Sequence, residues 1–453
     1  MSTICAISTP NAVGGLSVIR ISGEKSIEIA AKIFQPFSTK AVEKMGGYTC
    51  CFGKVVFNGE EIDEGILTVF RAPKSFTGEN VCEISCHGGL YVTKQVLRAI
   101  ISSGAKPAEA GEFTKRAFLN GKLSLTQAEA VMDMIMAQGE QSHRSAVSAH
   151  EGILFSRIKA MTDKLVSILG ELAAWVDYPE EDLPEIEYET FENSLHDVLG
   201  QLNLLLESYD TGRILREGIN TVIIGKPNVG KSTLMNMLLG FERSIVTDIA
   251  GTTRDIVEES VRLGDLVLRL SDTAGIHETT DTVEGVGVSL AFKKLNESDL
   301  IIAVFDNSSE LSKEDFDIVE KIKDKPSVAV INKSDLEQKL DKDFLKDKFK
   351  LVIEISAKEN FGQGELISSL EELFKINQFD ANAGVITNER QRGCIENAKA
   401  SLEKALVTLT SGETYDAVTV LIDEGANALL ELTGEKATEA VVNDVFSRFC
   451  VGK

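Results

Sequence analysis

The sequence GKPNVGKST, residues 225–233, follows the apolar run 222–224 and precedes a stretch with helical periodicity. A glycine-rich loop between a strand and a helix lets backbone N–H groups surround phosphates, and the pattern G-x-x-x-x-G-K-[ST] is typical of such loops. The Lys231 ammonium would reach the β- and γ-phosphates, and the Ser232 hydroxyl would bind Mg²⁺. The stretch therefore predicts a nucleotide-binding loop whose other contacts are Asn228, Val229, Gly230 and Thr233.

Three further motifs follow later predicted strands: DTAG at 272–275, NKSD at 332–335 and SAK at 356–358. The first would bring a carboxylate to the Mg²⁺ shell and an amide to the γ-phosphate. The Asp335 carboxylate can accept two hydrogen bonds from a guanine edge, which adenine does not offer. The SAK segment would donate a backbone amide to the guanine oxygen. Together the motifs predict binding of GTP rather than ATP through Asp272, Thr273, Ala274, Gly275, Asn332, Lys333, Asp335, Ser356, Ala357 and Lys358.

The segment TDIAGTT, residues 247–253, lies where a nucleotide-dependent switch is expected. Thr253 would bind Mg²⁺ only while the γ-phosphate is present, so hydrolysis would release the segment. The predicted nucleotide contacts here are Thr247, Asp248, Ile249, Ala250, Gly251, Thr252 and Thr253.

The glutamine that usually orients the attacking water is replaced by Ile276, which has no hydrogen-bonding side chain. Carboxylates within 278–284 are candidates for that task. Positive charge at the transition state would come from a partner, from Arg254 or from a monovalent cation. Asn228 and the oxygens of 247–252 could bind such a cation, and a local turn is the alternative role for Asn228.

Apolar runs at 222–224, 267–270, 300–305, 328–331 and 351–355 alternate with helical patterns, which predicts a doubly wound parallel sheet. Helical periodicity fills 158–172 and 191–206 and returns at 395–409 and 418–430, which indicates one helical domain in two segments. Short β-rich runs alternate with helices before residue 118. We therefore expect a multidomain chain that combines α/β and all-α parts. Its predicted parts are an N-terminal α/β domain at 1–118, helical segments at 119–215 and 379–453, and an inserted P-loop domain at 216–378.

The chain has 453 residues and a net charge of −23, which argues against broad wrapping of nucleic acid. Its seven cysteines include no CxxC pair, so we expect reduced thiols. The start of the chain is unlike a leader peptide, and no apolar run approaches about 18 residues. We expect a cytoplasmic protein without a membrane contact. Cys86 and His87 are interpreted as structural residues, and no zinc site is expected.

The chain resembles the MnmE (TrmE) family of tRNA-modification GTPases across essentially all 453 residues. The similarity rests on IRISG at 19–23, SFTGE at 75–79 and CHGG at 86–89. It also rests on GEFTKRAFLNGKL at 111–123 and FCVGK at 449–453. The order of these motifs around an inserted GTPase domain is more specific than any one of them.

The resemblance implies a homodimer whose GTPase domains meet when GTP binds. It implies K⁺ bound by Asn228, Thr247, Ile249 and Thr252, and a water-orienting Glu284. It further implies a flavin-dependent partner, MnmG (GidA), with which the chain would add an aminomethyl or carboxymethylaminomethyl group to C5 of wobble uridine. The acidic chain would leave most tRNA contacts to that partner.

The resemblance also implies an N-terminal site for 5-formyltetrahydrofolate or a related tetrahydrofolate, with contacts at Arg20, Glu83, Lys122 and Lys453. The alternative is that Arg20 and Lys122 are solvated surface charges and that Glu83 is a residue of an alternating strand. Cys450 would lie near the folate, where its thiol could act chemically, pack as a small apolar group or contact a partner. The predicted catalytic residues are thus Glu284, Lys231 and Cys450.

Two other functions compete with this interpretation. A ribosome-assembly GTPase is expected to carry a basic RNA-binding module, whereas the parts appended here are an acidic helical domain and an α/β domain. A one-carbon-transfer enzyme with a regulatory GTPase domain is the second alternative.

Overall fold

The computed structural model describes residues 1–39, 41–177, 188–240, 259–271, 295–412 and 414–452. The chain divides into two compact units, each built from segments far apart in the sequence. The first unit contains residues 1–132, 149–199 and 394–453. The second contains residues 133–148 and 200–393.

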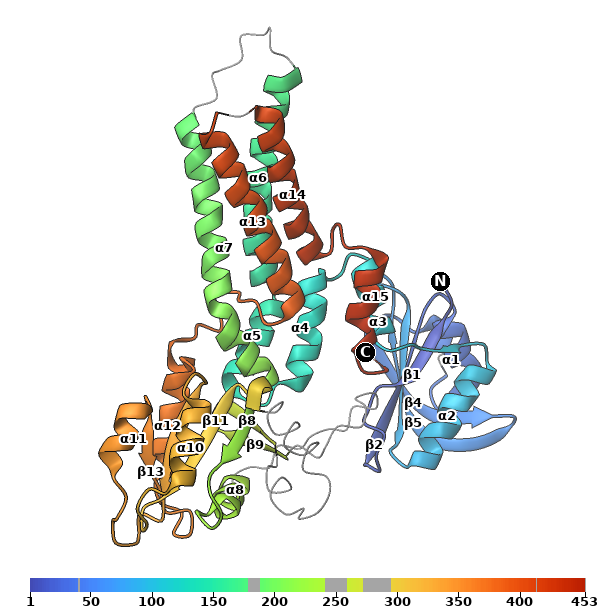
Figure 1. Cartoon of the computed structure of the whole chain (residues 1–453). Coiled ribbons are helices and arrows are strands. Elements are labelled where there is room, and N and C mark those ends of the chain that lie inside the picture. The colour runs from blue at the N-terminus through green and yellow to red at the C-terminus, as the bar shows by residue number, and fades with distance from the viewer. Residues whose placement is uncertain (40, 178–187, 241–258, 272–294, 413, 453) are drawn as a thin grey trace, which may run out of the picture. The chain divides into compact units, whose positions relative to one another are not determined.

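A seven-stranded sheet forms the N-terminal part of the first unit (Figure 1). Its strand order is β3-β4-β5-β6-β2-β1-β7, and all neighbours are antiparallel except β1 and β7. The strands are β1 (Ile4–Ile7), β2 (Leu16–Ser22), β3 (Phe34–Pro36), β4 (Thr49–Phe57), β5 (Glu60–Phe70), β6 (Val81–His87) and β7 (Lys106–Pro107).

Helices α1 (Ser26–Ile33) and α2 (Leu90–Ser102) share a buried core with this sheet. Ile19 and Ile21 of β2 enter that core together with Ile84 of β6. Because successive side chains of a strand point to opposite faces, Arg20 and Glu83 lie on the other face of the sheet. The predicted N-terminal α/β fold is confirmed, and it places two of the four predicted folate contacts, Arg20 and Glu83, on one face of the sheet.

The long helices of the chain are α6 (Ile153–Asp177), α7 (Tyr188–Glu217), α13 (Glu389–Thr410) and α14 (Tyr415–Thr433) (Figure 1). Leu165, Leu195, Leu402 and Ile422, one from each helix, are buried in the first unit. The predicted two-segment helical bundle is therefore present. The shorter helices are α3 (Glu112–Leu119), α4 (Leu125–Met136), α5 (Glu140–His150) and α15 (Glu439–Ser447).

Gly434 ends α14 with a φ of 94°, in the left-handed region that favours glycine. A Cβ at this position would lie 2.7 Å from both Leu125 Cβ and Phe118 Cε2. Glycine is thus needed for the backbone conformation and for close packing. The turn it makes leads the chain to α15 and the C-terminal tail.

The second unit contains a six-stranded sheet of order β13-β12-β11-β8-β10-β9, in which only β9 and β10 pair antiparallel. Its strands are β8 (Ile219–Ile224), β9 (Glu259–Leu263), β10 (Leu266–Ser271), β11 (Leu300–Asp306), β12 (Ser327–Asn332) and β13 (Val352–Glu354). Its helices are α8 (Lys231–Leu239), α10 (Lys313–Ile322), α11 (Lys342–Lys348) and α12 (Gln363–Leu373). Short 3₁₀ turns occur at Val42–Lys44 in the first unit and Ile376–Gln378 in the second.

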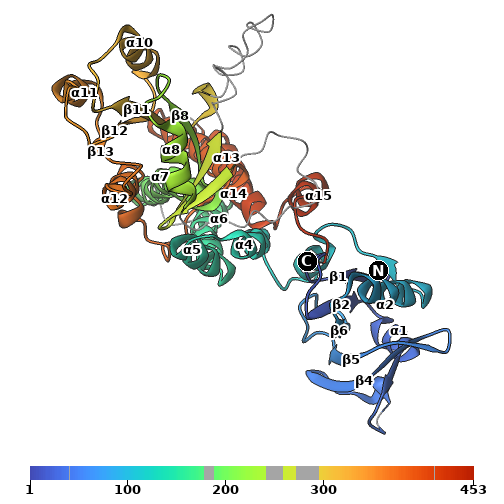
Figure 2. The ribbon, with the colours of Figure 1, turned by 90° about the horizontal axis from the view of Figure 1, so that it is seen from below.

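Both faces of the second sheet are covered, as the apolar runs predicted. Leu300, Ile302 and Val304 of β11 enter a core with residues of α8 and α12. Ile301 and Phe305 enter a separate core with residues of α10 and α11. Figure 2 shows these helix pairs on opposite faces of the sheet. The fold is the predicted doubly wound P-loop domain.

Residues 133–148, which include the end of α4 and most of α5, belong to the second unit together with this sheet. Asp265, in the turn between β9 and β10, accepts hydrogen bonds from the backbone amides of Glu140 at 2.7 Å and Gln141 at 3.3 Å. The negative charge of this carboxylate at the N-terminus of α5 also interacts favourably with the helix dipole. The Arg216 Nε–Asp133 Oδ1 contact of 2.6 Å adds a second attachment between helices α7 and α4.

Candidate functional site

The phosphate-binding loop predicted from residues 225–233 connects β8 to α8 at the carboxyl edge of the sheet. Gly230 caps α8 with a φ of 94°. A Cβ there would lie 2.2 Å from the side-chain nitrogen of Asn332, so any other residue would clash. The first amides of α8 consequently face the loop, an arrangement that suits an anion.

Lys231 folds back over the loop at the start of α8. Its ammonium donates hydrogen bonds to the carbonyl oxygens of Gly225 at 2.8 Å and Lys226 at 2.9 Å. Burial lowers the pKa of this lysine. Ser232 and Thr233 are exposed in the first helical turn. The loop therefore holds one cation and two hydroxyls beside the predicted phosphate position.

The Asn332 side chain joins three segments at this edge. Its Nδ2 donates to the Val229 carbonyl at 2.9 Å. Its Oδ1 accepts from the backbone amides of Lys333 at 2.8 Å and Ala357 at 3.0 Å. The amide of Ala357, in the segment expected to contact guanine, thus has a partner within the protein. Asn332 fixes the spacing between the predicted phosphate and base sites.

Lys333 gives the loop a second anchor. Its ammonium donates to the Asn228 carbonyl at 2.8 Å and to Asp306 Oδ2 at 2.6 Å. Burial acts to raise the pKa of Asp306, but hydrogen bonds from Lys333 and Ser308 outweigh it and hold that pKa below its usual value. Asp306 was absent from the sequence-based site. Its position directly after the apolar run 300–305 was the only available signal.

Lys226 makes a third anchor that the sequence did not reveal. Its ammonium lies 2.8 Å from Asp315 Oδ2. Asp315 is buried and also accepts hydrogen bonds from the backbone and side chain of Ser312 at the start of α10. The phosphate loop is thereby attached to a helix that carries none of the predicted site residues.

Asp335 is exposed, as a residue that contacts a base must be. Its Oδ1 accepts a hydrogen bond of 2.6 Å from the Ser356 hydroxyl, and that bond lowers its pKa. The hydrogen bond thus orients the carboxylate and favours its ionised form. Lys358, the last residue of the SAK segment, is also exposed.

The remaining predicted nucleotide and metal contacts lie outside the described residues. β10 ends at Ser271 and runs parallel to β8, so the chain leaves both strands at the same sheet edge. The predicted site residues outside the described ranges, including the water-orienting Glu284 and the folate contact Lys453, are Thr247, Asp248, Ile249, Ala250, Gly251, Thr252, Thr253, Asp272, Thr273, Ala274, Gly275, Glu284 and Lys453.

A second candidate site lies on the face of the N-terminal sheet opposite α1 and α2. Arg20 and Glu83 are cross-strand neighbours, and Arg20 Nε lies 2.8 Å from Glu83 Oε1. The guanidinium also lies over the rings of Phe76 and Phe113, at 5.7 Å and 5.6 Å from their centroids. The side chains are only 16% and 25% exposed, so Arg20 is not a freely solvated surface charge.

Lys122 is exposed, and its ammonium lies 3.4 Å from the Pro73 carbonyl oxygen. Pro73 is three residues before Phe76, so one loop contacts both Lys122 and Arg20. The structure therefore brings these two predicted cations to the same loop.

The C-terminal tail docks on the N-terminal domain within the first unit. The Cys450 carbonyl accepts a hydrogen bond from the Gly111 amide at 3.4 Å, and Val451 forms a β-bridge with Ala110. Gly452 has a φ of 100°, and a Cβ there would lie 2.4 Å from the Ile7 carbonyl oxygen. Cys450 itself is half-buried.

His87 and Cys86 have separate surroundings. His87 Nδ1 lies 2.7 Å from Asp63 Oδ1, while the Cys86 thiol is buried and its pKa is raised to about 11 by burial. No group of three or more His, Cys, Asp and Glu side chains suited to a metal occurs among the described residues. No described helix combines the length and apolar character needed to cross a bilayer.

Comparison with known proteins gives matches over nearly the whole chain. The family model "GTP-binding protein TrmE N-terminus" matches residues 3–122, and "MnmE helical domain" matches residues 125–450. The tRNA modification GTPase MnmE of Clostridioides difficile is 40% identical over 454 residues, covering 100% of this chain and 99% of that protein. The protein of the same name from Acetivibrio thermocellus is 42% identical over 456 residues, with the same coverage.

A solved structure of Era from Aquifex aeolicus bound to GDP and AlF₄⁻ is similar to part of the chain. The identity is 28%, the TM-score is 0.28, and the match covers 40% of this chain and 66% of that chain. The family matches and the full-length identities, by contrast, extend over both units. The chain therefore belongs to the MnmE (TrmE) family of tRNA-modification GTPases and is a GTP hydrolase.

Proposed function

We propose that this GTPase works with the flavin-dependent partner MnmG (GidA) to add an aminomethyl or carboxymethylaminomethyl group to C5 of wobble uridine. The observation that carries the proposal is the presence of two built sites in one chain. A guanine-nucleotide framework is organised around Asn332, and a shielded Arg20–Glu83 pair lies on the N-terminal sheet. The net charge of −23 agrees with leaving most tRNA contacts to the partner.

Within the nucleotide site, Asp335 reads guanine and Lys231 binds the β- and γ-phosphates. Ser232 and Thr253 bind Mg²⁺, whose charge offsets that of the phosphates. The 247–253 and 272–275 segments complete the nucleotide contacts named from the sequence. The Ser356–Asp335 hydrogen bond supports the base-reading role because it orients an ionised carboxylate.

Hydrolysis in this proposal depends on K⁺ bound by Asn228, Thr247, Ile249 and Thr252, with Glu284 orienting water. The chain would form a homodimer, and its two GTPase domains would meet when GTP and K⁺ are bound. Asn228 has a φ of 64°, and its carbonyl is engaged by Lys333. Its side chain is exposed at the phosphate loop, which supports a ligand role.

The N-terminal site would hold 5-formyltetrahydrofolate or a related tetrahydrofolate. The partly exposed Glu83 carboxylate suits the hydrogen-bond donors of a pterin edge, while Lys122 and Lys453 suit a glutamate tail. Arg20, whose guanidinium lies over two aromatic rings, would be the third cation that contacts the folate. The domains in this proposal are 1–118, 119–215, 216–378 and 379–453, in a cytoplasmic protein.

Changing Asp335→Asn should exchange guanine for xanthine specificity. The asparagine amide would place an N–H donor opposite C2 of the base. Guanine carries a donor amine at that position, whereas xanthine carries an acceptor oxygen. Loss of a charged hydrogen bond plus this mismatch should weaken GTP binding roughly 100-fold. Binding of GTP and XTP to the two proteins is measured by fluorescence titration.

Glu337→Gln, an equivalent change at an exposed position two residues along the same loop, should leave both affinities unchanged. Undiminished GTP binding by the Asp335→Asn protein would contradict the base-reading role.

Replacing K⁺ by Na⁺ at constant ionic strength should slow GTP turnover by about 10³–10⁵-fold, the range supplied by an arginine finger. Asn228→Gly should abolish this difference, because glycine keeps the left-handed backbone but removes the side-chain oxygen. Phosphate release is measured in both salts. If the variant remains K⁺-dependent, Asn228 is a turn residue and not a ligand.

Cys450→Ser should separate modification from hydrolysis. The substitution keeps a small side chain at a half-buried position and the backbone carbonyl that bonds to Gly111, so folding and GTP turnover should match wild type. Wobble-uridine modification should fall below detection if the thiol acts chemically. Modification is quantified by nucleoside mass spectrometry in the reconstituted reaction, and a normal rate would assign Cys450 to packing.

A further inference from the structure

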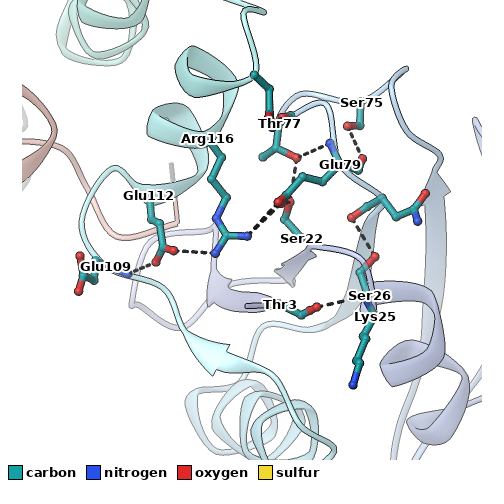
Figure 3. A network of polar contacts seen from close by, with 12 residues as sticks. Thr3, Ser22, Lys25, Ser26, Ser75, Thr77, Glu79, Glu109, Glu112 and Arg116 are labelled. Carbon is teal, nitrogen blue, oxygen red and sulfur yellow. Dashed lines mark hydrogen bonds and ion pairs between the residues drawn. The ribbon is translucent and has the colours of Figure 1, made fainter. Parts of the chain in front are cut away.

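Arg116 of α3 is a buried arginine at the centre of a network of polar contacts beside the proposed folate site (Figure 3). Its side chain is 4% exposed. One terminal nitrogen donates to both carboxylate oxygens of Glu79, at 3.1 Å and 3.0 Å, and the other donates to Glu112 at 2.7 Å. A single guanidinium therefore holds two carboxylates that are 33 positions apart in sequence.

Glu79 transmits the first of these contacts to the loop at residues 73–79. The Ser22 hydroxyl donates to Glu79 at 2.7 Å and lies 2.8 Å from the Thr77 hydroxyl. The Ser75 hydroxyl donates to the Glu79 carbonyl at 2.6 Å. This loop contains Phe76, whose ring lies against Arg20, and Pro73, whose carbonyl meets Lys122. Arg116 thus helps to set the shape of the loop that contacts two of the predicted folate cations, Arg20 and Lys122.

Glu112 transmits the second contact to the C-terminal tail. Its other oxygen accepts a hydrogen bond from the Glu109 amide at 2.9 Å. The adjoining residues Ala110 and Gly111 pair with Val451 and Cys450 respectively. The two carboxylates bound to Arg116 therefore lie on the 73–79 loop and at the start of α3, next to the backbone that pairs with the C-terminal tail.

Stability alone does not account for this arrangement. The Arg116 Nε is buried without a hydrogen-bond partner, and buried charge pairs give little net stabilisation because desolvation offsets their attraction. A planar guanidinium can bind two carboxylates in fixed directions, which an ammonium cannot. The arrangement favours a role in geometry.

We propose that Arg116 is a positioning residue that couples the loop at 73–79, which contacts Arg20 and Lys122, to the Cys450 segment. The inference rests on the proposed folate site and adds to it a specific mechanical link. Arg116 does not touch the ligand; it acts through Glu79 on Phe76 and Pro73, and through Glu112 on the backbone that pairs with Cys450.

Arg116→Lys in the full-length protein tests the link, because lysine keeps the positive charge but lacks the planar guanidinium that binds two carboxylates in fixed directions. Two quantities are measured: the dissociation constant for 5-formyltetrahydrofolate, and the rate of maleimide labelling at Cys450, quantified on the C-terminal peptide by mass spectrometry. In wild type, saturating folate should slow labelling severalfold. In the variant, folate affinity should fall about tenfold and this protection should disappear, while GTP turnover stays normal.

Single-arm variants and a stability control sharpen the test. Glu79→Gln should mainly weaken folate binding, whereas Glu112→Gln should mainly accelerate Cys450 labelling. Ile100→Ala removes a buried side chain of α2 from the core on the opposite face of the same sheet. It should lower the melting temperature at least as much as Arg116→Lys, yet preserve both folate affinity and protection.

Normal affinity together with normal protection in the Arg116→Lys protein would overturn the inference. The same loss of affinity and protection in Ile100→Ala would also overturn it, since general destabilisation would then explain the result. If wild type itself fails to bind the folate, the proposed site is wrong. In that case, faster Cys450 labelling in the Arg116→Lys protein than in wild type would still support the link through Arg116, and an unchanged labelling rate would overturn it.

Discussion

The nucleotide site depends on the amide side chain of Asn332. This one group ties the phosphate loop at Val229 to the base-reading segment at Ala357, so two loops from different strands keep a fixed separation. Its closeness to Gly230 also explains why that glycine cannot be replaced, independently of any demand from the phosphates. A rigid parallel sheet with both faces covered supplies the frame in which such a contact can persist.

Two lysines connect the phosphate loop to further elements of the domain. Lys333 connects Asn228 to Asp306 at the end of β11, and Lys226 connects the loop to Asp315 at the start of α10. The acidic partners are both partly or fully withdrawn from water, which makes each contact less sensitive to salt than an exposed ion pair. The phosphate loop is therefore supported from three neighbouring elements.

The sequence predicted those parts of the fold and site in which chemistry restricts the residue type. The continuous apolar run at 300–305 predicted a buried parallel strand, and its residues do alternate between two cores. Asn332 and Asp335 were found because guanine recognition requires their groups at that spacing. Asp306 and Asp315 were not found, because each acts through a lysine distant in sequence and no local pattern marks the pairing.

Arg116 illustrates a different limit. It lay inside the quoted motif at 111–123, but nothing in the sequence indicated that Glu79 and Glu112 would meet on it. Such a role depends on tertiary contacts between segments, which periodicity does not predict. Thr253, Asp272 and Glu284 lie outside the described residues, and their roles stay predictions.

The central claim is that this GTPase participates in wobble-uridine modification. Nucleoside mass spectrometry of tRNA from cells that lack the protein tests it most directly, with wild-type complementation as the control. The account predicts loss of the aminomethyl and carboxymethylaminomethyl uridines at the wobble position and their return on complementation. Unchanged levels of both nucleosides in the deletion strain would contradict it.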